Sequence, residues 1–465
     1  MAKAGEETID EVLSKIAAEK KLAEEVKVVP GTKPTPRSYF SMTAKEPDEI
    51  YIFGGEYLDG KRTTMFDNLY IFNTKENTWS EVQSSTKPAP RSSHQTILVN
   101  LPNQSPTLYL FGGEFVSKSQ TSFKHFNDLW AFNTKNKKWR QIKVATGPTG
   151  RSGFRLAPWK QGFVLFGGFF DNSISTVYYN DLWYFNCANE TWTKIQLPES
   201  PKILPRSNFI FSTSLDNKFI FIQGGFSRIS DPKNKSLEPE PKVHIDSIQI
   251  SFSDDGNIVV AVNKISGAKP SPPRTGLSFV KVSKSNNQLL VFGGVHDEYE
   301  DDDVYSTYSG EMLTLDPASS KWYKFNFQQE QNDGLEAMET DDAVPCPRSH
   351  AGLAVIKNTL FLYGGRSERG SKTITHDDMF SLDVTKPTKW NLLDVGTKEQ
   401  DWSTDSEDSS EEIDAPVPED GQDFPTYFAN NKDFWMDIAK EEKVKGSVEN
   451  FAQSLARQFY RDLRG

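Results

Sequence analysis

The strongest constraint on how this chain folds is a sequence unit that recurs six times along it. Each unit begins with an arginine followed by serine or threonine, and 16 to 21 residues later an apolar run ends in two adjacent glycines. The arginines are Arg37, Arg91, Arg151, Arg206, Arg274 and Arg348. The diglycines are Gly54 and Gly55, Gly112 and Gly113, Gly167 and Gly168, Gly224 and Gly225, Gly293 and Gly294, and Gly364 and Gly365. The regular spacing predicts six copies of one structural unit.

Five of the six units also carry a tryptophan 25 to 29 residues after the diglycine. These are Trp79, Trp139, Trp192, Trp322 and Trp390. The fourth unit differs, because an aliphatic run at residues 258–262 stands where the tryptophan strand is expected. We interpret the tryptophans as apolar wedges between neighbouring units. The diglycines mark positions where only a residue without a Cβ atom fits.

Four short strands are predicted within one unit. In the second unit they cover residues 93–99, 108–111, 128–132 and 139–142, and the polar turn 133–138 joins the last two into a hairpin. One four-stranded antiparallel sheet buries neither of its faces by itself. Six such sheets stacked around an axis bury both faces and close a ring. The sequence therefore predicts an all-β, six-bladed β-propeller.

These recurring residues resemble the Kelch repeat, whose pattern is an arginine-led first strand, a diglycine, an Asp-Leu-Tyr strand and a tryptophan. The likeness covers about residues 37–395. Residues 53–57, 111–115, 150–153 and 178–182 make the first three units most similar to the group of Kelch domain-containing protein 4 and its fungal and protist relatives. Proteins of this family are regarded as interaction scaffolds, so the resemblance implies binding and no reaction.

Two interpretations fit the six arginines. In related propellers the first strand lines the central channel, which would place the arginines in a ring near one mouth. Such a ring would bind an acidic or phosphorylated peptide through several guanidinium groups. In the other interpretation, each guanidinium bonds to backbone carbonyls or packs between sheets. We favour the second interpretation and keep the first as a candidate partner-binding site.

The histidines and cysteines form no recognisable catalytic or metal-binding pattern. The six histidines are dispersed, and Cys187 and Cys346 show no neighbouring base in the sequence. His94 takes a position that apolar residues hold in most other units, so we expect a packed core histidine. The residue patterns of Kelch-type copper oxidases and of plant specifier proteins are missing. We expect no enzyme activity, no metal and no cofactor, and a propeller metalloenzyme is the disfavoured alternative.

Charge is concentrated in one segment. The formal net charge is −11, and residues 396–423 hold eleven acidic residues and one lysine, which leaves the remainder at −1. A near-neutral body with an acidic segment argues against general nucleic-acid binding. No apolar run reaches the length of a membrane span, and two cysteines cannot form a disulfide framework. We expect a protein of the cytoplasm, and also of the nucleus, that does not bind membranes.

Four regions are predicted along the chain. Residues 1–25 have the apolar spacing of a short amphipathic helix, residues 26–395 form the propeller, residues 396–423 form an acidic disordered linker, and residues 424–465 form a helical hairpin. The strand-like start of the propeller region, residues 26–29, is a candidate to pair with the last sheet and help close the ring, although Trp390 indicates that this sheet already has its own outer strand. The aromatic residues of the C-terminal hairpin are too many for it to bury alone, so we expect it to dock on the propeller or on a partner.

These features predict a non-enzymatic scaffold that binds an unknown protein or peptide through its propeller loops. The alternative is a substrate adaptor of a cullin-type ubiquitin ligase. Residues 454–463 resemble an elongin-binding box in their Ser-Leu start and their final leucine. Phe459 stands where that box usually has a cysteine, and the same residues also fit the buried side of a helix. We therefore favour the plain scaffold.

Overall fold

The computed structural model describes most of the repeat region and part of the C-terminal segment. The described residues are 26–58, 62–117, 123–172, 175–229, 239–282, 287–300, 303–327, 344–370, 372–397, 422–441, 448–449, 452–453, 456–457 and 460. Contacts divide the chain into two compact units, residues 1–398 and residues 399–465. The predicted N-terminal helix and most of the predicted acidic linker lie outside the described residues. The domain boundaries given above therefore stay predictions.

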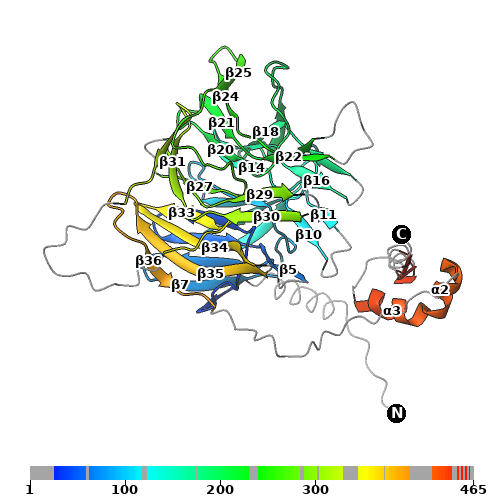
Figure 1. Cartoon of the computed structure of the whole chain (residues 1–465). Helices are drawn as coiled ribbons and strands as arrows, with labels where there is room; N and C mark the ends of the chain where they lie inside the picture. Colours follow the sequence, from blue (N-terminus) through cyan, green and yellow to red (C-terminus); the bar gives the residue numbers. More distant parts are fainter. Residues whose placement is uncertain are drawn as a thin grey trace, which may run out of the picture. The chain divides into compact units, whose positions relative to one another are not determined.

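Six antiparallel sheets, called blades here, build the first unit (Figure 1). Blade 1 contains β2 (Ser41–Lys45), β3 (Glu49–Phe53), β6 (Leu69–Asn73) and β7 (Thr78–Gln83). Blade 2 contains β8 (Gln95–Val99), β9 (Thr107–Phe111), β12 (Leu129–Asn133) and β13 (Lys138–Ile142). Blade 3 contains β14 (Arg155–Trp159), β15 (Gly162–Phe166), β18 (Leu182–Asn186) and β19 (Thr191–Ile195).

The other three blades repeat this arrangement. Blade 4 contains β20 (Ile210–Thr213), β21 (Phe219–Gln223), β24 (Ser247–Phe252) and β25 (Ile258–Asn263). Blade 5 contains β27 (Ser278–Lys281), β28 (Leu289–Phe292), β31 (Met312–Asp316) and β32 (Lys321–Lys324). Blade 6 contains β33 (Gly352–Ile356), β34 (Thr359–Arg369), β35 (Lys372–Asp383) and β36 (Asn391–Asp394). The six-bladed β-propeller predicted from the sequence is confirmed.

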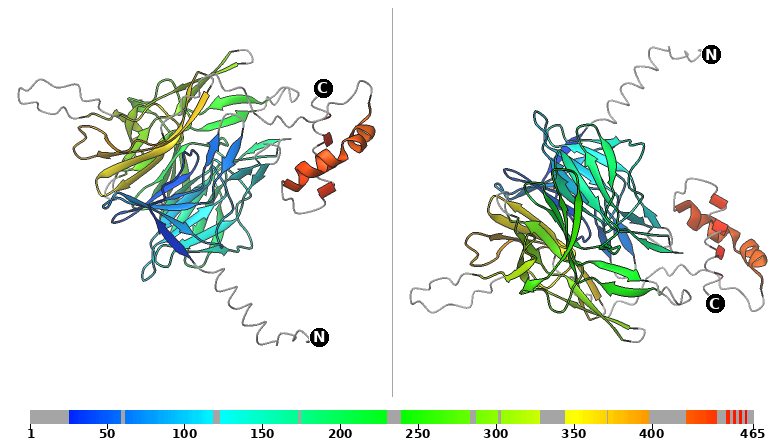
Figure 2. Two further views of the ribbon diagram at one scale, coloured as in Figure 1. Left: turned by 90° about the horizontal axis from the view of Figure 1, so that it is seen from below. Right: turned by 90° about the horizontal axis from the view of Figure 1, so that it is seen from above.

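The first strand of each blade lies nearest the axis of the ring. First strands of neighbouring blades contact one another, as β2 does with β8 and β8 does with β14. The ring closes where β33 of blade 6 contacts β2 of blade 1, and both views of Figure 2 show yellow blade 6 beside blue blade 1. The chain therefore completes one circuit between its first and last blades.

The tryptophans act as wedges between blades, as predicted. Trp79, Trp139, Trp192 and Trp390 each pack against the aromatic residue that precedes the diglycine of the blade before. Blade 4 has Gln223 at that place, and Trp322 of blade 5 packs instead in a cluster with Ile210 and Phe221 of blade 4. Trp139 of blade 2 lies 5.5 Å from Phe53 of blade 1, measured between ring centroids. Trp79 of blade 1 lies 5.6 Å from Tyr363 of blade 6. In blade 4 the buried side chain of Val260 takes this outer position, and the same strand leaves other aliphatic side chains exposed.

The diglycines bring backbone segments of adjacent blades into contact. Gly54 has a φ of +64°, and a Cβ atom there would lie 2.6 Å from the carbonyl oxygen of Arg91 in the next blade. Gly55 has a φ of +95°, and its Cβ atom would lie 2.8 Å from the carbonyl oxygen of Ser38. Both the left-handed backbone and the close approach require glycine, as the sequence analysis proposed.

Two short strands extend the outer edges of blades. β1 (Lys27–Pro30) pairs antiparallel with β7, the outer strand of blade 1, and β26 (Ser266–Gly267) pairs parallel with β32 of blade 5. The prediction that residues 26–29 pair with the last sheet is wrong. Blade 6 takes its outer strand β36 from its own repeat, so the strand that precedes blade 1 stays with blade 1.

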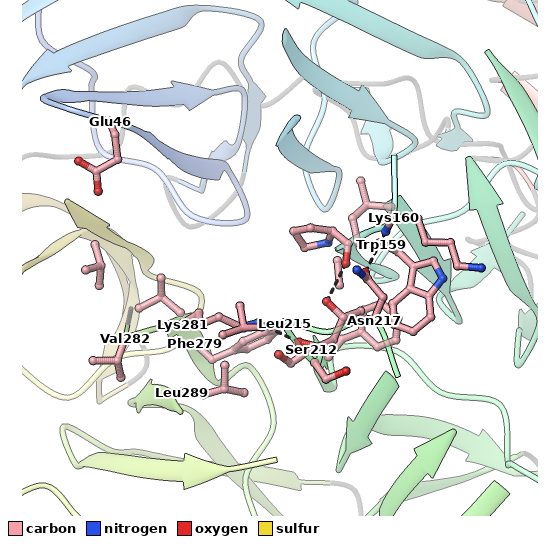
Figure 3. A pocket seen from close by; sticks show the side chains of 18 of the residues that line it. Glu46, Trp159, Lys160, Ser212, Leu215, Asn217, Phe279, Lys281, Val282 and Leu289 are labelled. Carbon is pink, nitrogen blue, oxygen red and sulfur yellow. Dashed lines mark hydrogen bonds between the residues drawn. The ribbon is translucent and has the colours of Figure 1, made fainter. Parts of the chain in front are cut away.

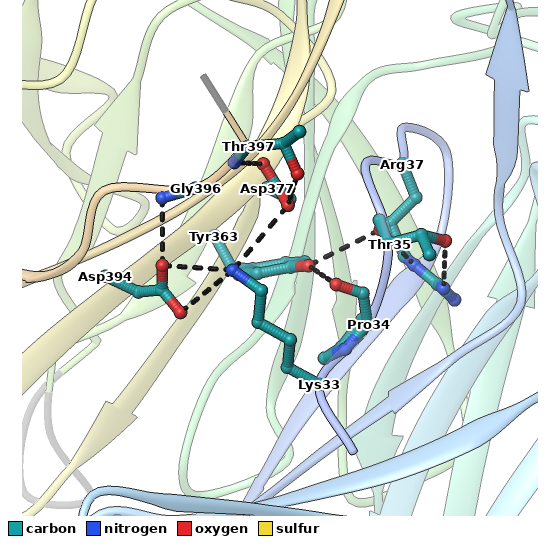
Figure 4. Close-up of polar contacts among 9 residues, drawn as sticks. All are labelled: Lys33, Pro34, Thr35, Arg37, Tyr363, Asp377, Asp394, Gly396 and Thr397. Atoms are coloured by element: carbon teal, nitrogen blue, oxygen red, sulfur yellow. Dashed lines mark hydrogen bonds and ion pairs between the residues drawn. The ribbon is translucent and has the colours of Figure 1, made fainter. Parts of the chain in front are cut away.

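A polar clasp joins the start of the propeller to its last blade (Figure 4). The ammonium of Lys33 lies 3.1 Å from one carboxylate oxygen of Asp394 and 3.8 Å from a carboxylate oxygen of Asp377. The carboxylate of Asp377, which is 4% exposed, accepts hydrogen bonds from the backbone N–H and the hydroxyl of Thr397. Tyr363 donates its hydroxyl proton to the carbonyl of Pro34 at 3.0 Å. These bonds tie the two chain ends of the propeller together.

The second unit contains helices that bury their own aromatic side chains. α2 (Phe424–Asn430) and α3 (Lys432–Glu441) are separated at Asn431, and residues 448–449, 452–453, 456–457 and 460 are also helical. Tyr427, Trp435 and Ala456 belong to one buried cluster made only of residues from this unit. The helical prediction is confirmed. The expectation that these aromatic residues cannot bury themselves is wrong for Tyr427, Phe428 and Trp435, which pack in a cluster with alanines of the segment after α3. The docking of this unit on the propeller or on a partner stays a prediction.

Replacing Trp139 with alanine tests the wedge. Trp139 is 5% exposed, and its indole packs against Phe53 and Phe132. We expect Trp139→Ala to lower the free energy of unfolding by about 3–5 kcal/mol, measured by urea denaturation. Val262→Ala, at a side chain that is 60% exposed on β25, is the control and should change it little. Equal stability of the two variants would contradict the wedge.

Replacing Asp377 with alanine tests the clasp. The change leaves the backbone N–H and hydroxyl of Thr397 without their acceptor, so we expect a loss of roughly 1–3 kcal/mol in unfolding free energy. Asp254→Ala, at an exposed aspartate in the β24–β25 turn, serves as the matched control. Thermal melts followed by circular dichroism would show the difference. A melting temperature unchanged from wild type in Asp377→Ala would mean that apolar packing alone closes the ring.

Candidate functional site

The six repeat arginines lie inside the propeller. Their side chains are at most 9% exposed. In blade 2, Arg91 donates two hydrogen bonds to the carboxylate of Asp128 at 2.7 and 2.9 Å and one to the carbonyl of Gly112 at 3.0 Å. Its guanidinium also lies 3.9 Å from the centre of the Phe126 ring. The arginine therefore connects the first strand, the diglycine and the third strand of its own blade.

The same pairing recurs around the ring, with one exception. The pairs are Arg91 with Asp128, Arg151 with Asp181, Arg206 with Asp246, Arg274 with Glu311, and Arg348 with Asp378. In blade 1, Asn68 stands at the position of the acid, and Arg37 instead lies 4.4 Å from the Phe66 ring and 5.2 Å from the Tyr70 ring. Burial without an anion lowers the pKa of Arg37.

This geometry favours the packing interpretation of the arginines. Their guanidinium groups bond within the blades, so they expose little surface to a partner. No partner has tested the predicted arginine ring, which stays a prediction. The acids that pair with the arginines were not foreseen as partners, although the Asp-Leu pattern that begins each third strand carried the signal.

A set of hairpins rises from one face of the propeller, and together they are called the hairpin crown here. They are β4 (Glu56–Leu58) with β5 (Thr63–Met65), β10 (Glu114–Val116) with β11 (Phe123–His125), β16 (Phe169–Asp171) with β17 (Thr176–Tyr178), β22 (Phe226–Ile229) with β23 (Glu240–Val243), and β29 (Val295–Glu300) with β30 (Asp303–Tyr308). The distal parts of β34 and β35 form the sixth hairpin. Neighbouring hairpins contact one another from blade 5 through blades 6, 1, 2 and 3 to blade 4, and Figure 1 shows β5, β10, β11, β16 and β22 on the same side.

The base of the crown has two different halves. The residue directly after each diglycine bridges to the serine or threonine of its own repeat, and these six residues are called the mouth residues here. They are Glu56, Glu114, Phe169, Phe226, Val295 and Arg366. Blades 6, 1 and 2, which are consecutive around the ring, supply the charged members, and blades 3, 4 and 5 supply the apolar ones. The mouth therefore presents a charged half opposite an apolar half.

Among the described residues, neither glutamate at the mouth forms an ion pair with a lysine or an arginine, although the charge of Arg366 acts on Glu56 and opposes the rise of its pKa. Burial is the main cause that raises the pKa of Glu56, and burial together with the nearby Glu56 charge raises the pKa of Glu114 to about 7. The Nε2 atom of His125 lies 3.8 Å from Glu114, but it accepts the backbone N–H of Asp171, so the proton sits on Nδ1 and bonds to Ser152. Burial lowers the pKa of His125, which keeps this imidazole neutral.

Arg366 supplies the positive charge of the mouth. Its Nε atom is buried and has no hydrogen-bond partner among the residues that the structure describes. The guanidinium lies 5.2 Å from the centre of the Tyr39 ring, which stacks on His350 at 3.9 Å. The neighbouring Tyr39 is the first cause that raises the pKa of Arg366. A buried N–H group without an acceptor is costly, so the position of Arg366 is maintained by its surroundings and not by a hydrogen bond from Nε.

Large apolar side chains are exposed on four consecutive hairpins of the crown. They are Phe123 at 44%, Val177 at 46%, Ile229 at 38%, and Val304 and Tyr305 at 54% each. Exposed apolar groups gathered on one face commonly mark an interaction site. Sequence reasoning missed this surface, because alternating residues in short hairpins do not reveal which side faces solvent.

The remaining cysteine and histidine predictions have mixed outcomes. His94 is buried, bonds to Ser41 at 2.9 Å and has a pKa lowered to about 3 by burial, which confirms the core assignment. The prediction that neither cysteine has a neighbouring base is wrong for Cys346, whose Sγ atom lies 3.6 Å from Nε2 of His376. Burial raises the pKa of the Cys187 thiol to about 11. Within the described residues, no cluster of three potential ligands could hold a metal ion.

Several known proteins are similar to this chain. A family model described as the KLHDC2/KLHL20/DRC7 Kelch-repeats domain matches residues 4–230. Kelch domain-containing protein 3 from Bos taurus is 22% identical over 363 residues, which cover 73% of this chain and 82% of that protein. Host cell factor from Drosophila melanogaster is 24% identical over 292 residues, which cover 62% of this chain and 17% of that protein. This chain thus corresponds to a small part of Host cell factor.

A solved structure shares the fold. The structure of YjhT aligns with a TM-score of 0.53 at 15% identity, over 77% of this chain and 98% of that one. None of the described helices is long and apolar enough to span a membrane.

Replacing Glu114 with glutamine tests the electrostatics of the mouth. Because the folded-state pKa of about 7 exceeds the ordinary value of 4.5, the folded protein binds the proton more tightly than the unfolded chain does. Protonated Glu114 therefore stabilises the folded state. This stabilisation is fully present below pH 4.5 and is lost as the pH rises through about 7. We expect Glu114→Gln to be more stable than wild type at pH 8 by on the order of 1–2 kcal/mol, and to differ less at pH 5.

Urea denaturation at both pH values measures this effect. Glu76→Gln, at an exposed glutamate in the β6–β7 turn, is the control and should leave the pH dependence unchanged. If Glu114→Gln followed the wild-type pH profile, Glu114 would have an ordinary pKa in the folded protein.

Proposed function

We propose that this chain is a Kelch-repeat β-propeller that serves as a non-enzymatic scaffold and binds a protein partner on its hairpin crown. The Kelch propeller is a typical protein-interaction fold, and its relatives are generally of that type. The blades use their buried arginines and tryptophans for packing. The hairpins, by contrast, differ in sequence from blade to blade, which suits them to specific recognition.

The exposed apolar residues of the crown carry the proposal. Phe123, Val177, Ile229, Val304 and Tyr305 stand on hairpins that lie side by side in the ring. Covering them with a partner removes apolar surface from water, which is the main driving force of association. Tyr305 also offers a large ring with few rotatable bonds, a residue type that often contributes strongly to binding energy.

The mouth residues below the crown would determine how a bound partner segment is oriented. An acidic group on the partner would be attracted by the guanidinium charge of Arg366, and an apolar side chain would fit against Phe169, Phe226 and Val295. This arrangement supports an acidic partner segment through Arg366 instead of through the six repeat arginines. Glu56 and Glu114 would repel a second acidic group, so the segment would have to enter with its acidic group towards blade 6.

Several finer expectations stay proposals. They are the closer likeness to the group of Kelch domain-containing protein 4, a location in the cytoplasm and nucleus, and the role of a ubiquitin-ligase adaptor. Most of residues 454–463, on which the adaptor alternative rests, lie outside the described residues. Ala456 from this segment is fully buried in the C-terminal cluster, which fits the packing interpretation of these residues.

A matched pair of double variants tests the crown. Val304→Ser with Tyr305→Ser removes apolar groups from the β29–β30 hairpin, and Val259→Ser with Val262→Ser removes groups of similar exposure from the outer strand of blade 4. We expect the first variant to capture at least tenfold less of a protein that wild type captures from cell extract, as measured by quantitative mass spectrometry. The second should retain it.

Thermal melts of both variants establish that they fold. If the crown variant folds and captures the same proteins in the same amounts as wild type, the crown is not the binding surface. If the blade 4 variant alone loses them, the partner binds at the outer edge of the propeller.

A further inference from the structure

A second site lies at the opposite end of the propeller from the hairpin crown. A cavity of about 900 Å³ opens among the turns that connect the first and second strands of the blades. Within a blade these two strands are antiparallel, so their connecting turn and the crown hairpin that follows the second strand lie at opposite ends. The cavity is therefore separate from the proposed partner surface.

The walls of this cavity are mainly apolar. Blade 3 contributes Leu156 and Trp159, blade 4 contributes Phe211, and blade 5 contributes Phe279 and Val280. Figure 3 shows Phe279 with Lys281 and Val282 on one side and Trp159 with Asn217 on the other. A volume of this size with apolar walls and a few polar groups is typical of a site for a small ligand.

The ammonium group of Lys281 lies among the apolar residues that line the cavity. Lys281 donates a hydrogen bond from Nζ to the carbonyl of Thr213 at 2.8 Å, which uses one of its three protons. Among the described residues, no carboxylate lies within ion-pair distance of this ammonium. Burial lowers the pKa of Lys281, which reflects a positive charge without a counterion.

A second, partly buried cation lies beside Phe279. The guanidinium of Arg155 is 5.5 Å from the centre of the Phe279 ring, and its Nε atom bonds to the carbonyl of Phe209 at 3.1 Å. Burial is the one cause that lowers the pKa of Arg155, to about 10, and no anion opposes it. Phe279 and Lys281 point to the same face of β27 because they are two residues apart. Arg155 and Lys281 therefore both lie near the Phe279 side of the cavity wall.

Lysines at the rim of the cavity make the electrostatic potential inside it more positive. Lys160 and Lys357 are exposed lining residues, and Glu46 is the single acid among the residues that line the cavity. One carboxylate oxygen of Glu46 is already engaged, because it accepts the backbone N–H of Lys357 at 3.1 Å. With three lysines against one glutamate, the lining attracts an anion.

We propose that this cavity binds a small amphipathic carboxylate, with the carboxylate on Lys281 and the apolar body against Trp159, Phe211 and Phe279. The two remaining protons of the Lys281 ammonium bond to the ligand. Arg155 adds attraction from behind the wall. The apolar body replaces water on the aromatic surfaces. The site takes one negative charge, since it offers one ammonium in its apolar interior.

Isothermal titration calorimetry with decanoate and decanol tests the site on the full chain. The two probes share an apolar chain and differ in charge, so we expect decanoate to bind at least tenfold more tightly. Lys281→Met should reduce the affinity for decanoate to that for decanol, because it keeps the apolar stem and removes the charge. Lys281→Arg should retain most of the affinity. Lys357→Met, on the rim, should change it less than threefold.

Two results would overturn the proposal. One is equal affinity of wild type and folded Lys281→Met for decanoate. The other is failure of decanoate to bind wild type. If, in that case, a capped peptide with one glutamate among apolar residues binds instead, the cavity is a peptide site and the proposal is equally overturned. The crown variant with Val304→Ser and Tyr305→Ser should bind decanoate normally, so this test is independent of the proposed partner surface.

Discussion

A buried arginine that finds its counterion within the same blade is the interaction on which the rest of the propeller depends. A buried guanidinium is tolerated when its charge and its N–H groups are satisfied. Arg91 meets this condition through Asp128 and the carbonyl of Gly112, and three other blades repeat both bonds. Arg274 of blade 5 pairs with Glu311, but its buried Nε atom has no hydrogen-bond partner among the described residues. The pair fixes where the second strand ends and the third begins. The crown hairpin, which connects these strands, therefore starts from a rigid base.

The repeat units made most of the fold predictable. Diglycines, tryptophans and arginines each have one packing role that their chemistry dictates, so six copies sufficed to predict six blades. The arginine ring was harder to judge, because the same residue type binds phosphate or carboxylate when exposed. The burial of the arginines depends on Asp128 and its counterparts in the other blades. Each of these acids lies 30 to 40 residues after its arginine along the chain. Sequence spacing alone does not show that these groups meet.

Features that arise between repeats were the ones that sequence reasoning missed. His376 reaches Cys346 across 30 residues, and the mouth residues of six different blades come together only in the closed ring. Lys281 looks like an ordinary surface lysine at the end of a strand, and the sequence does not show that its ammonium is partly buried and bonds to the carbonyl of Thr213 in β20 of another blade. Strand β1 was assigned to the wrong blade because both possible partners present the same kind of edge.

The pairing of β1 with blade 1 also determines the order in which the molecule can be assembled. Every blade is built from one uninterrupted stretch of chain, so each sheet can form as soon as its repeat has left the ribosome. Blade 1 does not need to wait for the C-terminal repeats to complete it. The ring closes only when β33 meets β2, and a nascent chain that stops before β33 would leave the apolar flank of blade 1 open to chaperones or to aggregation.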